Sequence, residues 1–142
     1  MARHHLDEHE QAAAFHEGIR LFNAGEWFEA HEVWEDIWHM AEGAKREFYQ
    51  GLIQAAVMIE HARRGNPRGV RSLHDNCFKH LARFTEPYMG IDIPALLNDL
   101  DAFIHPVLTL PESRFAPDHP RDPLPLQWET VPHIHLLHDP FA

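Results

Sequence analysis

The chain has 142 residues, of which 44% are hydrophobic and 24% charged, and its 22 Asp and Glu against 12 Lys and Arg give a formal net charge of -10. The length suits a single domain, and these proportions exclude a wholly disordered or fibrous chain. The acidic balance repels a phosphate backbone and an anionic membrane surface, so we expect no nucleic acid and no membrane among the partners.

Cysteine use and hydropathy indicate the cellular compartment. Cys77 is the only cysteine and cannot form an internal disulfide, and the first ten residues, MARHHLDEHE, lack the apolar run of a signal peptide. The longest nearly uncharged apolar stretch, residues 48–59, is too short to cross a bilayer. We therefore expect a cytoplasmic protein. Its 14 histidines are scattered, so the chain is histidine-rich without a tag-like tract.

Two helices are predicted before residue 43. Along the first, apolar residues recur every three or four positions, as on one face of a helix: Ala12, Phe15, Ile19 and Phe22. Gly25 ends this helix, since glycine readily adopts the left-handed conformation that closes a helix. The second helix begins at Glu26 and ends at Gly43, and its wide apolar stripe comprises Trp27, Ala30, Trp34, Ile37 and Ala41.

Three further helices are predicted, over residues 44–64, 67–84 and 94–104. The first of these is apolar nearly all round, as expected for the buried centre of a bundle. Its boundary with the next helix is marked by Gly65, Asn66 and Pro67. These residues suit, in order, a helix terminator, an N-cap and a first helical position.

The last part of the chain differs in composition. Eight of the eleven prolines lie between Pro106 and Pro140, where no periodic run is long enough for a helix. We therefore predict an all-α fold, a compact bundle of about five helices with a proline-rich extended C-terminal tail. In this interpretation residues 1–105 form the helical bundle domain, and residues 106–142 form a tail that packs on the bundle or on a neighbouring subunit.

One polar cluster is the candidate site. His31 precedes Glu35 by four residues on the second helix, so the two side chains can touch. A histidine and a carboxylate one turn apart can hold a divalent metal. If His61 of the third helix faces the same space, the set has the composition of facial-triad iron sites, and we weigh Zn, Mn or Fe as the metal. The groups expected to bind a ligand there are Glu32, Glu35, Gln50 and Gln54.

A purely structural explanation of this cluster stays open. Buried polar groups need hydrogen-bond partners, and a His, a Glu and two Gln between crossing helices can satisfy one another without any ligand. Cys77 lies on an apolar stripe, which does not suggest a nucleophile. The tract HIHLLHD, residues 133–139, alternates histidines as chelating tracts do, but adventitious binding is the simpler explanation near a terminus.

A joint pattern in the second and third helices resembles a known family. FNAGEWFEAHEVWEDIW, followed by FYQGLIQAAVMIEHARRGNPRG, is similar to the signature of a small prokaryotic family, domain of unknown function family 309. The resemblance covers residues 15–81 and implies an all-helical bundle of orthogonal hairpins, but no reaction, because the family has none assigned. The positions that fit are Phe22, Asn23, Gly25, Glu29, His31, Glu32, Glu35, Trp38, Gln50, Gly51, Gln54, His61, Gly65 and Asn66.

Three functions from different classes remain open. The preferred one is a non-catalytic interaction or scaffold module for a protein partner, because FNAGEWFEA also resembles the inter-helix turn of a tetratricopeptide repeat. The second is a metal-dependent hydrolase that activates water at His31, Glu35 and His61. The third is a small-molecule binder that uses the His/Glu/Gln cluster. Whether the chain is an enzyme stays open, and its aromatic helices and apolar tail are compatible with a homodimer.

Overall fold

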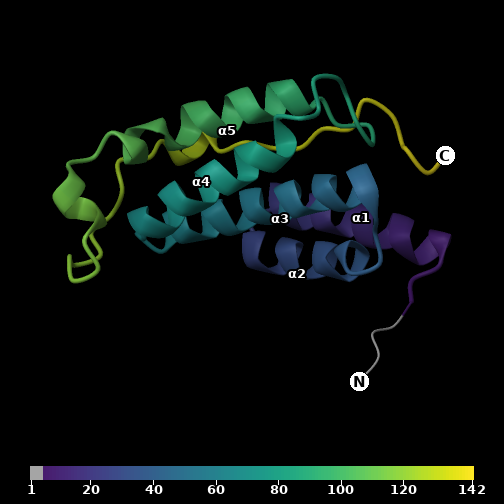
Figure 1. Ribbon diagram of the computed structural model, residues 1–142, viewed down its shortest axis with the longest axis horizontal. Helices are drawn as coiled ribbons and strands as arrows, with labels where there is room; N and C mark the ends of the chain where they lie inside the picture. The colour runs from purple at the N-terminus through teal and green to yellow at the C-terminus, as the bar shows by residue number, and fades with distance from the viewer. Residues whose placement is uncertain (1–4) are drawn as a thin grey trace.

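Five α-helices and two short 3-10 helices make up the part of the chain that the computed structural model describes, residues 5–142 (Figure 1). The α-helices are α1 Glu8–Asn23, α2 Trp27–Trp38, α3 Gly43–Arg63, α4 Pro67–Leu81 and α5 Ile93–Leu108, and the 3-10 helices are η1 Glu112–Phe115 and η2 Trp128–Thr130. Between residues 5 and 142 the only β-pairing consists of isolated bridges. The predicted all-α fold is confirmed.

Local signals set where several helices begin. At the start of α1, the Asp7 carboxylate accepts a hydrogen bond from the Glu10 N–H at 2.8 Å, and the Glu10 side chain accepts from the Asp7 N–H at 3.1 Å. This reciprocal pair is a capping box. At the start of α4, Asn66 caps Gly69 N–H at 3.3 Å, and Pro67 is the first helical residue. The helix boundary predicted there is confirmed.

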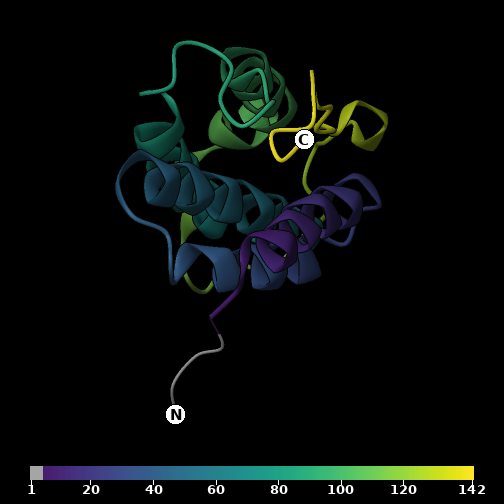
Figure 2. The ribbon, with the colours of Figure 1, turned by 90° about the vertical axis from the view of Figure 1, so that its right-hand side faces the viewer.

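The bundle is built around α3. This helix contacts α2 on one side and α4 on the other, while α1 packs on α2 and α5 packs on α4 (Figure 2). The central position explains why α3 is apolar nearly all round, with Phe48, Leu52 and Ile59 fully buried. No helix between residues 5 and 142 combines the length and the apolar character needed to span a membrane.

The ends of three helices differ from the prediction. The second helix ends at Trp38 instead of Gly43, and α4 ends at Leu81, where the chain turns into the next segment. By contrast, α5 continues beyond residue 104 to Leu108 and includes Pro106. Val107 is fully buried and continues the apolar stripe of α5 by one turn, so packing extends the helix past a residue that usually ends one.

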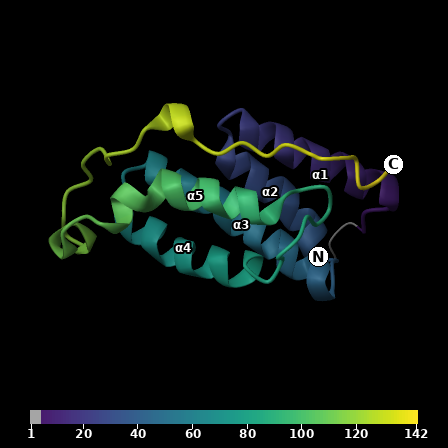
Figure 3. The same cartoon turned by 90° about the horizontal axis from the view of Figure 1, so that it is seen from above.

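The segment after α5 returns along the bundle and lies between α5 and α1 (Figure 3). The Asn23 side chain donates to the carbonyl of Ile134 at 2.8 Å and accepts from its N–H at 2.7 Å. The Trp128 ring contacts Trp27 of α2 and Phe103 of α5, with ring centroids 5.6 Å and 5.1 Å apart. The division at residue 105 remains an interpretation, since α5 spans it.

Candidate functional site

His31 and Glu35 form the contact that their spacing predicts. The Nε2 atom of His31 lies 3.3 Å from a carboxylate oxygen of Glu35, one turn along α2. The other ring nitrogen, Nδ1, contacts the backbone carbonyl oxygen of Phe28. The side chain of His31 is only 14% exposed. Both ring nitrogens therefore face oxygen atoms of their own helix.

His61 occupies a different contact, between α3 and α4. The side-chain amide of Asn66 donates to His61 Nδ1 over 3.0 Å. The ring also lies against Gly69, where an added Cβ would stand 2.5 Å from the ring. Burial, followed by the charges of Arg64 and Arg121, lowers the pKa of His61. The imidazole therefore suits a neutral, hydrogen-bonded role at this helix contact.

The structure brings together only part of the predicted metal set. His31 and Glu35 are neighbours, whereas His61 contacts the start of α4. Over residues 5–142, no group of three or more His, Cys, Asp or Glu side chains is placed to hold a metal ion. Binding of a divalent metal by His31, Glu35 and His61 remains a prediction. Of the three side chains, the structure places His31 and Glu35 next to each other.

The other residues of the predicted cluster have different surroundings. Glu32 is exposed on α2, whereas Gln54 is half-buried on α3. The side-chain oxygen of Gln54 is buried and has no hydrogen-bond partner in the described part of the chain. Gln50 lines a cavity of about 360 Å³, together with Trp38, Gly43, Arg46, Glu47 and His80. Ligand binding by this cluster also remains a prediction.

Cys77 is buried on α4, in the core. Its S–H donates to the carbonyl oxygen of Gly51 over 3.5 Å. Burial raises the pKa of the thiol to about 12. Because the thiolate is the nucleophilic form of cysteine, such a thiol is unreactive at neutral pH. Its role is packing between α3 and α4.

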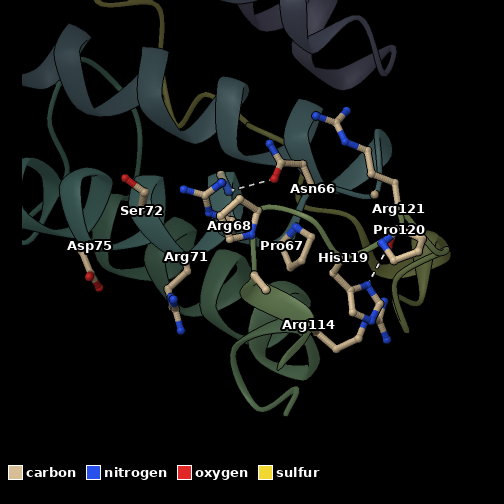
Figure 4. Close-up of a pocket in the computed structure, with 14 residues that line it drawn as sticks. Asn66, Pro67, Arg68, Arg71, Ser72, Asp75, Arg114, His119, Pro120 and Arg121 are labelled. Atoms are coloured by element: carbon tan, nitrogen blue, oxygen red, sulfur yellow. Dashed lines mark hydrogen bonds between the residues drawn. The ribbon is translucent and has the colours of Figure 1, made fainter. Parts of the chain in front are cut away.

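A second concave site lies at the beginning of α4 (Figure 4). It is a pocket of about 590 Å³ between α4 and the segment around η1 and residues 116–121. We call it the arginine pocket, because its lining includes Arg68, Arg71, Arg114, Arg121 and His119. The N-terminus of α4 adds the partial positive charge of a helix dipole to these side chains.

Within the described part of the chain, three of the four guanidinium groups of the arginine pocket have no carboxylate partner. Arg71 pairs with Glu112 at 3.1 Å. Within residues 5–142, however, no carboxylate oxygen lies within 4.0 Å of a side-chain nitrogen of Arg68, Arg114 or Arg121. The Nε atom of Arg114 is buried and lacks a hydrogen-bond partner in the same part of the chain. Uncompensated positive charge therefore gathers at one place in an acidic protein.

Sequence reasoning missed the arginine pocket. It identified the helix start at Asn66 and Pro67, and the arginines that follow on α4 are an available signal for an anion site. Arg114 and Arg121 gave no such signal, because they lie in a proline-rich stretch without periodicity. Only the path of the chain after α5 brings them beside α4.

Fold and site together define an all-α helical bundle with a cationic pocket at the start of its fourth helix. Residues 15–73 match the model of a family described as Domain of unknown function (DUF309). The predicted resemblance to this family is thereby confirmed for that segment. The match includes the α4 side of the arginine pocket up to Ser72, whereas Arg114, His119 and Arg121 lie beyond it.

A relative is similar to this chain over a longer stretch than the family model. The chain is 25% identical over 109 residues to an uncharacterized protein of Aquifex aeolicus (strain VF5). The aligned region covers 76% of this chain and 32% of the relative. The chain thus spans about a third of the length of that protein. Neither comparison assigns an activity.

Proposed function

We propose that this protein is a non-catalytic binding module and that the arginine pocket binds an anionic partner. The observation that supports this proposal is the grouping of Arg68, Arg114 and Arg121 around one pocket without carboxylate partners within residues 5–142. The protein has 22 acidic residues against 12 Lys and Arg, so carboxylates that could pair with these arginines are abundant in the chain. That the three arginines are nevertheless unpaired within residues 5–142 supports a site for an external anion.

Electrostatics favours an anion at this place. Like charges around one concave site repel one another, and an anion in the pocket replaces that repulsion by attraction. Arginine also presents a planar fork of N–H donors that matches carboxylate and phosphate oxygens. The start of α4 orients its dipole toward the same space. These effects act together, which supports binding of a group with more than one negative charge.

The surroundings of the candidate metal ligands and of Cys77 support binding over catalysis. His31 contacts Phe28 and Glu35, and the half-buried ring of His61 accepts a hydrogen bond at a helix contact. The thiol of Cys77 is buried, with a raised pKa. These contacts fit the structural explanation of the polar cluster, so the metal-dependent hydrolase is not favoured.

Calorimetric titration of the protein with citrate and with inorganic phosphate, at constant ionic strength, tests the proposal. We expect saturable binding that weakens about tenfold in each of Arg68→Ala and Arg121→Ala, because a charge-assisted contact contributes more than 1 kcal/mol. Lys79→Ala is the matched control, since it removes an exposed positive charge from the same helix outside the pocket. Absence of binding, or equal weakening by the control, would refute the proposal.

A further inference from the structure

We propose that the arginine pocket takes the phosphate monoester of a polyhydroxy compound, such as a sugar phosphate. This inference rests on the proposed function and names the class of ligand. Its basis is the uneven distribution of polar groups along the pocket: the unpaired arginines and a histidine surround one end, and a hydroxyl, a carboxylate and Arg71, which pairs with Glu112, lie along α4 at the other.

The size of the pocket is the first argument. Its volume of about 590 Å³ falls in the range of sites for whole organic ligands, roughly 300 to 1,000 Å³. A free phosphate ion would leave most of that space unfilled. A phosphate attached to a larger body uses both the cationic groups and the remaining volume.

The cationic end lies around the start of α4. Arg114 and His119 are close to Pro67 in Figure 4, and Arg121 borders the same end. Because Pro67 has no N–H, Arg68 provides the first backbone N–H of the helix. A phosphate monoester carries a charge of about -1.5 to -2 at neutral pH and three acceptor oxygens. This charge compensates the unpaired guanidinium groups better than a single carboxylate does.

The opposite end offers groups that recognise hydroxyls. Ser72 and Asp75 line the pocket on the face of α4 that also carries Arg68 and Arg71. With a rise of about 1.5 Å per residue, Asp75 lies about 12 Å along the axis from Pro67. A carboxylate accepts hydrogen bonds from hydroxyl groups but repels phosphate. Asp75 therefore favours a ligand whose charged and hydroxylated ends are separate.

The lining also distinguishes a sugar phosphate from a nucleotide. The residues that form the pocket include no Phe, Tyr or Trp, and the nearby Phe115 ring is covered by the Arg71 guanidinium at 3.8 Å. Binding of a nucleobase commonly uses an aromatic ring as a stacking surface. Away from its cationic end the pocket instead offers the polar side chains of Ser72 and Asp75, which can bond the hydroxyl groups of a sugar.

Titration calorimetry at fixed ionic strength tests the inference with ribose 5-phosphate, glucose 6-phosphate, inorganic phosphate, ribose and glucose. We expect at least one sugar phosphate to bind about tenfold more tightly than phosphate, and the neutral sugars to bind far more weakly. Asp75→Asn should remove most of this advantage, whereas inorganic phosphate should bind as tightly or more tightly, because a carboxylate that repels it is gone. Asp101→Asn is the matched control: Asp75 and Asp101 both pair with His74, at 3.5 Å and 3.3 Å, but Asp101 does not line the pocket.

Two results would overturn the inference while leaving the proposed function in place. One is phosphate and citrate binding that depends on the arginines, with no gain for either sugar phosphate. The other is a gain that Asp75→Asn and Asp101→Asn leave equally unchanged. If no anion binds at all, the proposed function and the inference both fail.

Discussion

Gly18 lies in the middle of α1, where the indole of Trp34 covers its backbone. An added Cβ would stand 2.0 Å from Nε1, 2.4 Å from Cε2 and 2.5 Å from Cδ1 of Trp34. Favourable carbon contacts begin near 3.5 Å, so the ring would have to retreat by more than about 1 Å. Trp34 is fully buried, and its Nε1–H donates to the Phe15 carbonyl over 3.4 Å. Gly18→Ala therefore overpacks the contact between α1 and α2.

The expected magnitude follows from opposing effects. Overpacking in the variant costs about 1 to 3 kcal/mol, and weakening of the Trp34 hydrogen bond by the displaced indole adds about 1 kcal/mol. The gain in helix propensity from glycine to alanine offsets about 1 kcal/mol. The net loss in the free energy of unfolding is thus about 1 to 3 kcal/mol.

Urea unfolding followed by circular dichroism measures this loss independently of the tryptophan signal. The matched control is Ala13→Gly, at an exposed position of the same helix, which should lose only the propensity term of about 1 kcal/mol. Pairing Gly18→Ala with Trp34→Phe should give a measurable coupling between the two positions. A Gly18→Ala protein as stable as the parent, or more stable, would show that propensity outweighs packing here and refute the reasoning.

Two other predictions concern tertiary contacts. Asn23→Ala removes both hydrogen bonds to Ile134 and should destabilise the fold by about 1 to 3 kcal/mol. Hydrogen exchange at the Ile134 amide should become faster than in the exposed control Asn98→Ala. An exchange rate equal to that of the control would contradict this prediction. Hydrogen bonds from Arg63, and then from Arg64, lower the pKa of Glu60 below its usual 4.5. The ionised Glu60 therefore stabilises the fold above pH 4.5, and this contribution is lost as the pH falls below that value. The difference in melting temperature between the parent and Glu60→Gln should therefore be largest above pH 4.5 and narrow below it, and a constant difference would contradict the assignment.

Side-chain chemistry within single turns made much of the helical fold predictable. Gly65, Asn66 and Pro67 mark the α3–α4 boundary because each acts on the backbone within one turn. The His31–Glu35 contact was predictable for the same reason, since residues four apart are neighbours on any helix. The position of His61 was not, because its partner depends on which face of α3 meets α4.

The sequence by itself determined the helical class, the main helix boundaries and the resemblance to the domain of unknown function family, since these depend on spacing and on local capping. Only the tertiary structure decided that His61 packs on Gly69 and that Arg114 and Arg121 join Arg68 around one pocket. The physical reason is that charges in an irregular segment carry no periodic signal. The neighbours of Arg114 and Arg121 depend on the path of the chain after α5, and long-range contacts such as that of buried Ile134 with Asn23 set this path.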